Sequence, residues 1–138
     1  MLDLVHSVMH RYRSQQYRFL RDRPHDITHM DGKVLGYFGR HPGATQKDLA
    51  QHSGRDKAQL ARLIKGLREG GLMVAVANQS DRRHVCLSLT ADGQSVQRSL
   101  QQQARRLSAK AVAGLSAAEH RQLITLLQQV STNLGDPP

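Results

Sequence analysis

Cysteine and glutamate are scarce in this sequence of 138 residues, and each shortage excludes something. The single cysteine, Cys86, excludes an internal disulfide framework and suits a reducing compartment. The two glutamates, Glu69 and Glu119, are readily explained as helix-surface residues. Since no nucleophile elbow, phosphate-binding loop or metal-ligand cluster appears either, the sequence predicts neither an enzyme nor a cofactor.

Long hydrophobic runs are also missing. No uninterrupted apolar segment approaches the roughly 20 residues that a membrane-spanning helix needs. The N-terminal segment lacks the basic head and apolar stretch of a signal peptide, because charged and polar residues interrupt it from Asp3 onward. The length fits one domain, and we expect a cytoplasmic protein without a membrane partner.

Positive charge is what the sequence has in excess. The formal net charge is +9, and the isoelectric point is about 10.6. Residues 40–85 carry nine Lys or Arg and four Asp or Glu, a net of +5, whereas residues 1–30 and 86–138 each carry a net of +2. A generally basic surface is one explanation. The concentration of charge in the middle of the chain favours a polyanionic partner that binds there.

Hydrophobic periodicity and turn residues predict the element order α, α, α, α, β, β, α, α. The expected helices lie at about 4–20, 31–40, 45–52, 56–69, 90–113 and 116–134, and the expected strands at 72–77 and 85–89. Three pairs have the spacing of helix N-terminal caps: Thr45 and Asp48, Asp56 and Gln59, and Ser116 and Glu119. The apolar stripes of the terminal helices are too long for the small middle part to cover, so these helices need each other or a second copy of the chain.

The third and fourth predicted helices, joined by a turn at residues 53–55, have the layout of a helix-turn-helix. The second helix of such a motif enters the major groove of DNA. Its apolar residues recur at i, i+3, i+4 and i+7, namely Leu60, Leu63, Ile64 and Leu67. With these residues facing inward, small and cationic side chains occupy the outer faces.

Those outer faces carry the chemistry of DNA recognition. Gln59 and Arg62 are suited to paired hydrogen bonds with base edges, while Lys57 and Lys65 are suited to phosphates. A solvated, salt-bridged helix face is the alternative explanation. Asp56 is the only acidic residue in the first three turns, so pairing of the cations is poor and a groove-facing role is favoured.

Residues 78–83 are predicted to form the polar tip of a β-hairpin between the two strands. An arginine at such a tip, here Arg82 or Arg83, is able to enter a narrow minor groove, where the negative potential is enhanced. Asp81 is able to fix an arginine rotamer through a charge-assisted hydrogen bond. Taken alone, residues 81–83 would indicate only a polar turn. Because they follow a cationic helix, they indicate the DNA-binding wing of a winged helix-turn-helix. The predicted fold is therefore mainly α with a small β-hairpin, a winged helix-turn-helix.

The succession of a helix-turn-helix, Gly70-Gly71-Leu72-Met73, Asp81-Arg82-Arg83 and Leu87-Ser88-Leu89-Thr90-x-x-Gly93 resembles the MarR family of bacterial transcriptional regulators. Segments 42–50 and 115–119 are also similar, so the resemblance covers nearly the whole chain. It implies a single domain, residues 1–138, with a winged helix-turn-helix lobe at 31–90 and a helical dimerisation region at 1–30 and 91–138. It further implies a homodimer that represses transcription at a palindromic operator and is often relieved by a small phenolic or other lipophilic anion.

Carried onto matching positions, the resemblance implies that Gln59 and Arg62 read bases and that Arg83 is the minor-groove residue, braced by Asp81. The complete expected DNA-binding set is Gln46, Arg55, Lys57, Gln59, Arg62, Lys65, Asp81, Arg82 and Arg83. One departure concerns segment 73–77, which has no charge where family members often place a basic residue. A phosphate contact from the first strand is therefore not expected.

Three features keep more than one interpretation. His6 and His10 have a metal-ligand spacing, but surface histidines are favoured because acidic partners are few. Cys86 is favoured as an ordinary strand residue over a redox sensor. A ligand pocket would form between the first two helices and the long helix. Its candidates are Tyr12, Tyr17, His10, Arg13 and Tyr37, each also explained by packing, so no ligand-binding residue is assigned.

The leading hypothesis is a sequence-specific repressor that binds double-stranded DNA. The alternative is a non-specific or architectural nucleic-acid-binding protein, which would use the same charges without reading bases.

Overall fold

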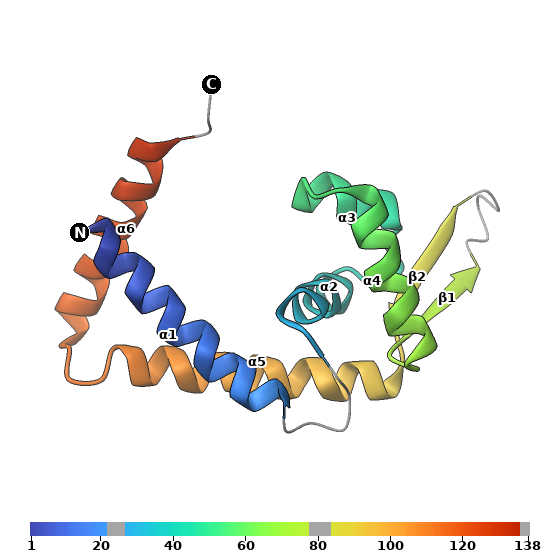
Figure 1. The fold of residues 1–138 in the computed structure, drawn as a ribbon, viewed down its shortest axis with the longest axis horizontal. Coiled ribbons are helices and arrows are strands. Elements are labelled where there is room, and N and C mark those ends of the chain that lie inside the picture. Colours follow the sequence, from blue (N-terminus) through green and yellow to red (C-terminus); the bar gives the residue numbers. More distant parts are fainter. Residues whose placement is uncertain (22–26, 78–83, 136–138) are drawn as a thin grey trace. The chain divides into compact units, whose positions relative to one another are not determined.

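A computed structural model describes residues 1–21, 27–77 and 84–135 (Figure 1). The elements are α1 (Leu2–Arg21), α2 (His29–Arg40), α3 (Gln46–Ser53), α4 (Lys57–Glu69), β1 (Met73–Ala77), β2 (Val85–Leu89), α5 (Ala91–Ala111) and α6 (Ala117–Leu134). The predicted order and the mainly helical fold with one antiparallel hairpin are confirmed. The expected hairpin tip, residues 78–83, lies outside the described residues.

Side-chain caps decide where several helices begin. Thr45 and Ser116 each form the predicted capping box, with Asp48 and Glu119 respectively. The predicted cap at Asp56 is confirmed, but its pairing with Gln59 is wrong: the carboxylate of Asp56 accepts a hydrogen bond from the nearer amide of Ala58, at 3.3 Å.

Helix α2 begins earlier in the chain than the sequence pattern predicts. The helix begins at His29 rather than at about residue 31. Thr28 accepts a hydrogen bond from the amide of Asp31, and the Asp31 carboxylate accepts one from the amide of Thr28, at 3.1 and 3.0 Å. This capping box provides partners for amides that the first turn leaves unpaired, and so it starts the helix earlier.

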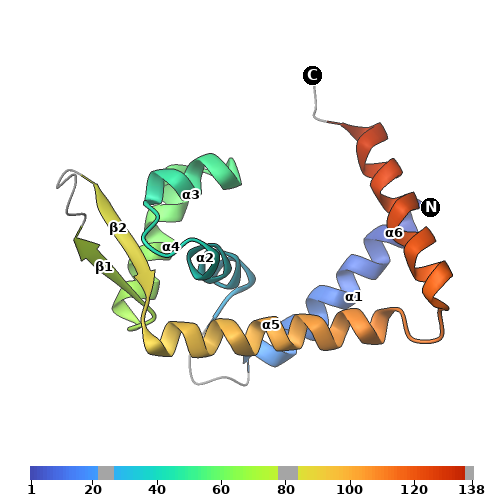
Figure 2. The same cartoon turned by 180° about the vertical axis from the view of Figure 1, so that it is seen from behind.

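Strand β2 connects the hairpin to the helix-turn-helix. It pairs antiparallel with β1 from Met73 opposite Leu89 to Ala77 opposite Val85. On its other edge, the amide of Leu87 donates to the carbonyl of Ala44 at 2.9 Å, just before α3 begins. The hairpin therefore shares backbone hydrogen bonds with the segment that starts α3. Figure 2 shows the hairpin and α3 from behind.

The core lies where α2, α3, α4 and the hairpin meet. The largest fully buried side chains are Phe38, Leu35, Leu60, Leu72 and Val34. Burying an aliphatic or aromatic side chain of this size stabilises a fold by about 1.5–3 kcal/mol. The predicted inward face of α4 is confirmed at Leu60, Ile64 and Leu67.

The first turn of α5 packs against the end of the α4–β1 connection. The hydroxyl of Thr90 donates to the carbonyl of Gly71 at 2.6 Å and accepts from the amide of Gly93 at 3.0 Å. The amide of Thr90 donates to the carbonyl of Leu72 at 3.1 Å. A Cβ at Gly93 would collide with that same carbonyl oxygen, so the close approach requires glycine.

The chain divides into two compact units, residues 1–104 and residues 105–138. In the second unit, none of the described residues of α6 is buried. Its exposed apolar side chains are Leu123, Ile124, Leu126, Leu127 and Leu134. None of the described helices combines the length and the apolarity that crossing a membrane requires.

Candidate nucleic-acid interface

A tight turn orients α3 and α4 relative to each other. Gly54 ends α3 in the left-handed conformation, with φ of +64°, and its amide donates to the carbonyl of Ala50 at 3.0 Å. The amide of Arg55 donates to the hydroxyl of Ser53 at 3.3 Å. Asp56 then caps α4, so the whole turn takes only three residues and the arginine lies at its centre.

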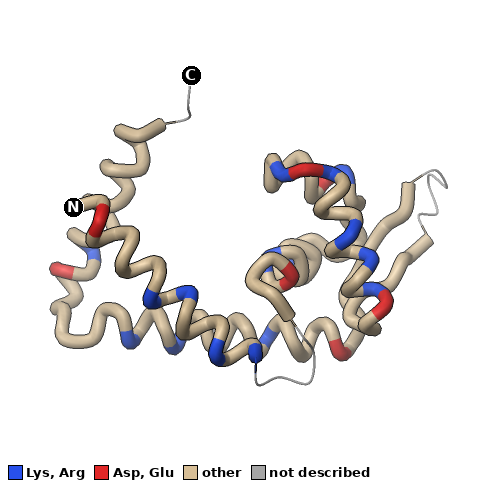
Figure 3. Tube along the Cα trace, viewed as in Figure 1, with Lys and Arg blue, Asp and Glu red and all other residues tan. Residues whose placement is uncertain are grey.

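The outer surface of α4 carries the predicted groove-facing residues. Lys57, Gln59, Arg62 and Lys65 are all exposed, opposite the buried face. Basic residues recur along α3, the turn and α4 (Figure 3). Ala58 adds a small exposed side chain between them, which allows a close approach to a groove floor.

One of these cations has an acidic partner on the same helix. The ammonium group of Lys65 lies 3.9 Å from a carboxylate oxygen of Glu69, and both side chains are mostly exposed. The expectation of poor pairing therefore does not hold for Lys65. An exposed pair of this kind contributes about 0.3–0.5 kcal/mol, so a phosphate is able to displace the carboxylate.

The start of α3 adds a polar and a basic residue to the same lobe. Gln46 is the first residue of α3 and is partly exposed, and Lys47 beside it is exposed. Hydrogen bonds from Thr45 lower the pKa of Asp48, and the charges of His84 and Lys47 lower it further. Lys47 and His84 were not in the predicted set. Lys47 could have been predicted from the sequence, because it is adjacent to Gln46. The position of His84 near Asp48 could not, because it depends on the pairing of β2 with segment 43–45.

The remaining predicted residues are Arg55, which is exposed in the turn, and the hairpin residues Asp81, Arg82 and Arg83. The last three lie outside the described residues, so their predicted role in a minor groove stays a prediction. The described stem that leads to them is uncharged on β1, as the sequence indicated.

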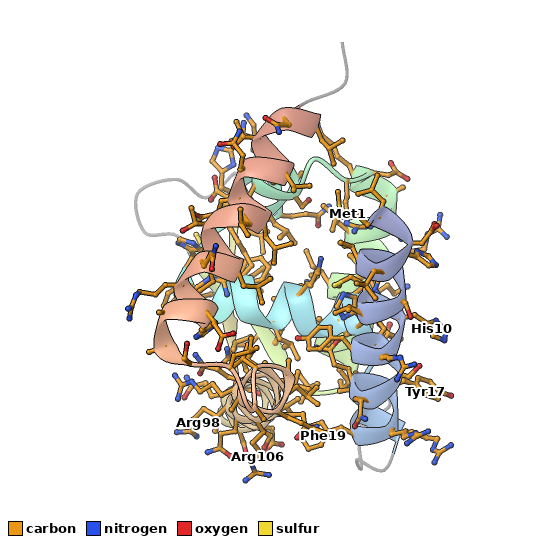
Figure 4. The ribbon with its side chains drawn as sticks, turned by 90° about the vertical axis from the view of Figure 1, so that its left-hand side faces the viewer. Met1, His10, Tyr17, Phe19, Arg98 and Arg106 are labelled. Atoms are coloured by element: carbon orange, nitrogen blue, oxygen red, sulfur yellow. The ribbon has the colours of Figure 1, made fainter. Side chains whose placement is uncertain are left out.

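A cavity of about 620 Å³ lies beside this lobe, in the unit formed by residues 1–104. Its lining comes from α1, α2, α3, the turn before α4, α4 itself and α5, and includes Tyr12 and Tyr37, as the sequence suggested. Arg13 is not part of the lining. Tyr17 and His10 project outward from α1 and are not part of it either (Figure 4).

The cavity is positively charged. Lys33, Arg40 and Arg55 line it, and no carboxylate does so among the described residues. Burial lowers the pKa of His29, which also lines the cavity, and the charges of Lys33, Arg13 and Arg55 lower it further. A cavity with this lining favours an anion with an apolar body, because Phe19, Leu49 and Leu100 also contribute to its walls.

The lowered pKa of His29 has a consequence for stability. As the pH falls below 6.5, the ordinary pKa of histidine, His29 of the unfolded chain takes up a proton before His29 of the folded chain does. The contribution of His29 to the free energy of unfolding is therefore fully present above pH 6.5 and declines as the pH falls. Urea denaturation at about pH 7.5 and about pH 5.5, on either side of the ordinary histidine pKa, checks this. The free energy of unfolding of H29Q should fall less on acidification than that of the wild type. An equal fall in both proteins would contradict the lowered pKa of His29.

The histidines and Cys86 were the other features left open by the sequence. In the parts of the chain that the structure describes, no group of three or more His, Cys, Asp or Glu side chains is arranged to hold a metal ion. Cys86 is partly buried, is a free thiol and pairs with Val76 in the hairpin.

The helix-turn-helix of α3 and α4, followed by the antiparallel hairpin of β1 and β2, defines a winged helix-turn-helix protein of the DNA-binding class. A profile of the MarR family matches residues 25–84. A protein of Thauera aromatica described as a "putative transcriptional regulatory protein for hcr operon" is 30% identical over 148 residues, covering 99% of this chain and 89% of the relative. This chain belongs to the MarR family, and it is a DNA-binding transcriptional regulator rather than an enzyme.

Solved structures share the same fold. The reduced form of MarR from Escherichia coli is 26% identical, has a TM-score of 0.78, and covers 94% of this chain and 95% of its own. FabT of Streptococcus pneumoniae, solved in complex with DNA, is 19% identical with a TM-score of 0.87, and covers 96% of this chain and 93% of its own.

Proposed function

We propose that the protein acts in the cytoplasm as a homodimeric repressor that binds a palindromic operator and is released by a small anionic effector. The observation that carries the proposal is the exposed, cationic outer face of α4 opposite its buried face. The proposed DNA-binding residues are Gln46, Arg55, Lys57, Gln59, Arg62 and Lys65 from the helix-turn-helix, and Asp81, Arg82 and Arg83 from segment 78–83.

Exposed apolar faces support the dimer. In α6 the exposed apolar side chains follow one another at helical spacing, and α1 exposes Leu2, Leu4 and Val8. Apolar faces of this extent on terminal helices are typical of surfaces that another copy of the chain covers. A twofold dimer presents two equivalent helix-turn-helix lobes, and this symmetry matches a palindromic site.

The cationic cavity supports the effector. Its volume is in the range of pockets that hold small molecules, and its lining combines apolar walls with fixed positive charge. An anion with an aromatic or other apolar body fits both properties. The cavity also reaches the turn between α3 and α4, so a bound molecule would lie next to the DNA-binding surface.

Replacing Arg62 with alanine tests the reading of bases. We expect operator affinity to fall by about 1–3 kcal/mol and the preference for operator over random DNA to shrink, since a paired hydrogen bond to a base is lost. Fluorescence anisotropy with a fragment obtained by in vitro selection and a scrambled duplex measures both.

The matched control is K57Q, which removes a charge from the same helix. It should weaken binding to both duplexes alike and flatten the salt dependence, because a phosphate contact carries no sequence information. Equal affinity of the wild type for selected and scrambled DNA would favour the alternative, a non-specific architectural protein. Full specificity in R62A would contradict the base-reading role of Arg62.

A further inference from the structure

Arg55 belongs to two surfaces at once. It is exposed at the centre of the turn between α3 and α4, beside the cationic start of α4. It also lines the 620 Å³ cavity together with Lys33, Arg40 and His29. Among the proposed DNA-binding residues that the structure describes, it is the one that lines this cavity.

The side chain is available to a ligand on either side. Within the described ranges, no carboxylate lies close enough to Arg55 to form an ion pair. Its backbone is held by the hydrogen bond to Ser53 and by the glycine before it, so the turn stays in place while the long side chain is able to change direction. The guanidinium group binds carboxylate and phosphate oxygens with the same pair of parallel hydrogen bonds.

An anion inside the cavity would attract the guanidinium group of Arg55. The positive charge of Arg55 reaches His29 inside the cavity, as do the charges of Lys33 and Arg13. These like charges repel one another. A bound carboxylate would convert this repulsion into attraction and draw the guanidinium group inward.

We propose that Arg55 couples the effector cavity to the operator: an anion in the cavity takes the guanidinium group that otherwise binds a DNA phosphate. This inference rests on the proposed function, since it needs both an effector and a DNA contact by Arg55. One guanidinium group in each subunit cannot serve both anions, so the two ligands compete. Anion binding in the cavity therefore weakens DNA binding through a single shared residue.

The test compares R55Q with the wild-type protein, using sodium benzoate and sodium 1-naphthoate as the probes. Operator affinity is measured by anisotropy at increasing probe concentration, with the same concentration of sodium chloride as the reference. We expect the probes to weaken wild-type binding at least about fivefold beyond chloride. R55Q should bind DNA more weakly from the start, with a salt slope reduced by about 0.9 for each lost phosphate contact, and should respond little to the probes.

Two matched variants separate the two roles of Arg55. K57Q lies two residues away on the DNA-binding surface but does not line the cavity, so it should lose DNA affinity and keep the response to the probes. K33Q lines the cavity from α2, outside the helix-turn-helix, so it should keep DNA affinity and respond to higher probe concentrations only. Thermal unfolding of each variant verifies that it is folded.

The outcomes are distinguishable. Release of R55Q by the probes to the same extent as the wild type would overturn the coupling through Arg55 and leave the proposed effector regulation standing. An unchanged salt slope in R55Q would overturn the phosphate contact. A wild-type protein that the probes release no better than chloride would overturn the coupling together with the effector part of the proposed function.

Discussion

Replacement of Gly93 with alanine is expected to destabilise the fold by about 3 kcal/mol, the upper end of the usual cost of overpacking. A Cβ at this position would collide with the carbonyl oxygen of Leu72 and lie 3.0 Å from its carbonyl carbon. Both atoms belong to the backbone of Leu72, whose carbonyl already accepts a hydrogen bond from Thr90. Moving either Leu72 or the start of α5 away would therefore strain or break this hydrogen bond. The loss should exceed the gain in helix propensity of about 1 kcal/mol that alanine normally brings. Urea denaturation of the two proteins measures the difference.

Gly66→Ala is the matched control for this prediction. Gly66 also lies within a helix, but a Cβ there would meet nothing within 4 Å. The same substitution should therefore stabilise the protein by about 1 kcal/mol, through helix propensity alone. If G93A were as stable as the wild type, the close contact between α5 and the carbonyl of Leu72 would be wrong.

Two aspartates in the apolar face of α6, L123D combined with L127D, are expected to abolish the dimer. Both leucines are exposed in the single chain, one turn apart, so the substitutions leave its buried core unchanged. In a dimer interface they would bury unpaired charges at a cost of several kcal/mol. The variant should sediment as a monomer, and its operator affinity should fall by about 100-fold or more, because linked binding to two half-sites is lost.

Gln128→Asp combined with Thr132→Asp is the control for the α6 variant. These residues are also one turn apart on α6, on the opposite side of the helix, and they introduce the same two charges. This protein should remain dimeric and keep its operator affinity. A wild-type protein that sediments as a monomer at the concentrations of the binding assay would contradict the proposed dimer itself.

Much of the DNA-binding lobe could be predicted from the sequence, because its signals act within a few residues. The caps at Thr45 and Ser116, the glycine turn at Gly54 and the apolar positions of α4 are all local patterns. The same periodicity that buries Leu60 necessarily turns Arg62 outward. Where prediction erred, at the start of α2, the missed signal was also local, since Thr28 and Asp31 are three residues apart.

Other features could not be predicted because they join residues that are distant in the sequence. His84 approaches Asp48 only because β2 pairs with the segment before α3. Of the residues proposed to line the pocket, Tyr12 and Tyr37 do so, whereas Tyr17 is exposed. The sequence could not distinguish Tyr12 from Tyr17, because a helical pattern does not show which side of α1 faces α2. Lining residues such as Gln97 and Leu100 come from α5, on the far side of the hairpin in the sequence.

By itself the sequence determined the succession of helices and strands, the helix-turn-helix and the cationic face of α4, because capping, turn geometry and periodicity operate over one or two helical turns. The tertiary structure alone decided that Gly93 meets the carbonyl of Leu72, that helices α1 to α5 line a cationic cavity, and that Arg55 lies at both this cavity and the proposed DNA-binding surface. Those relations depend on which buried faces pack against one another, and packing joins residues that no local pattern connects.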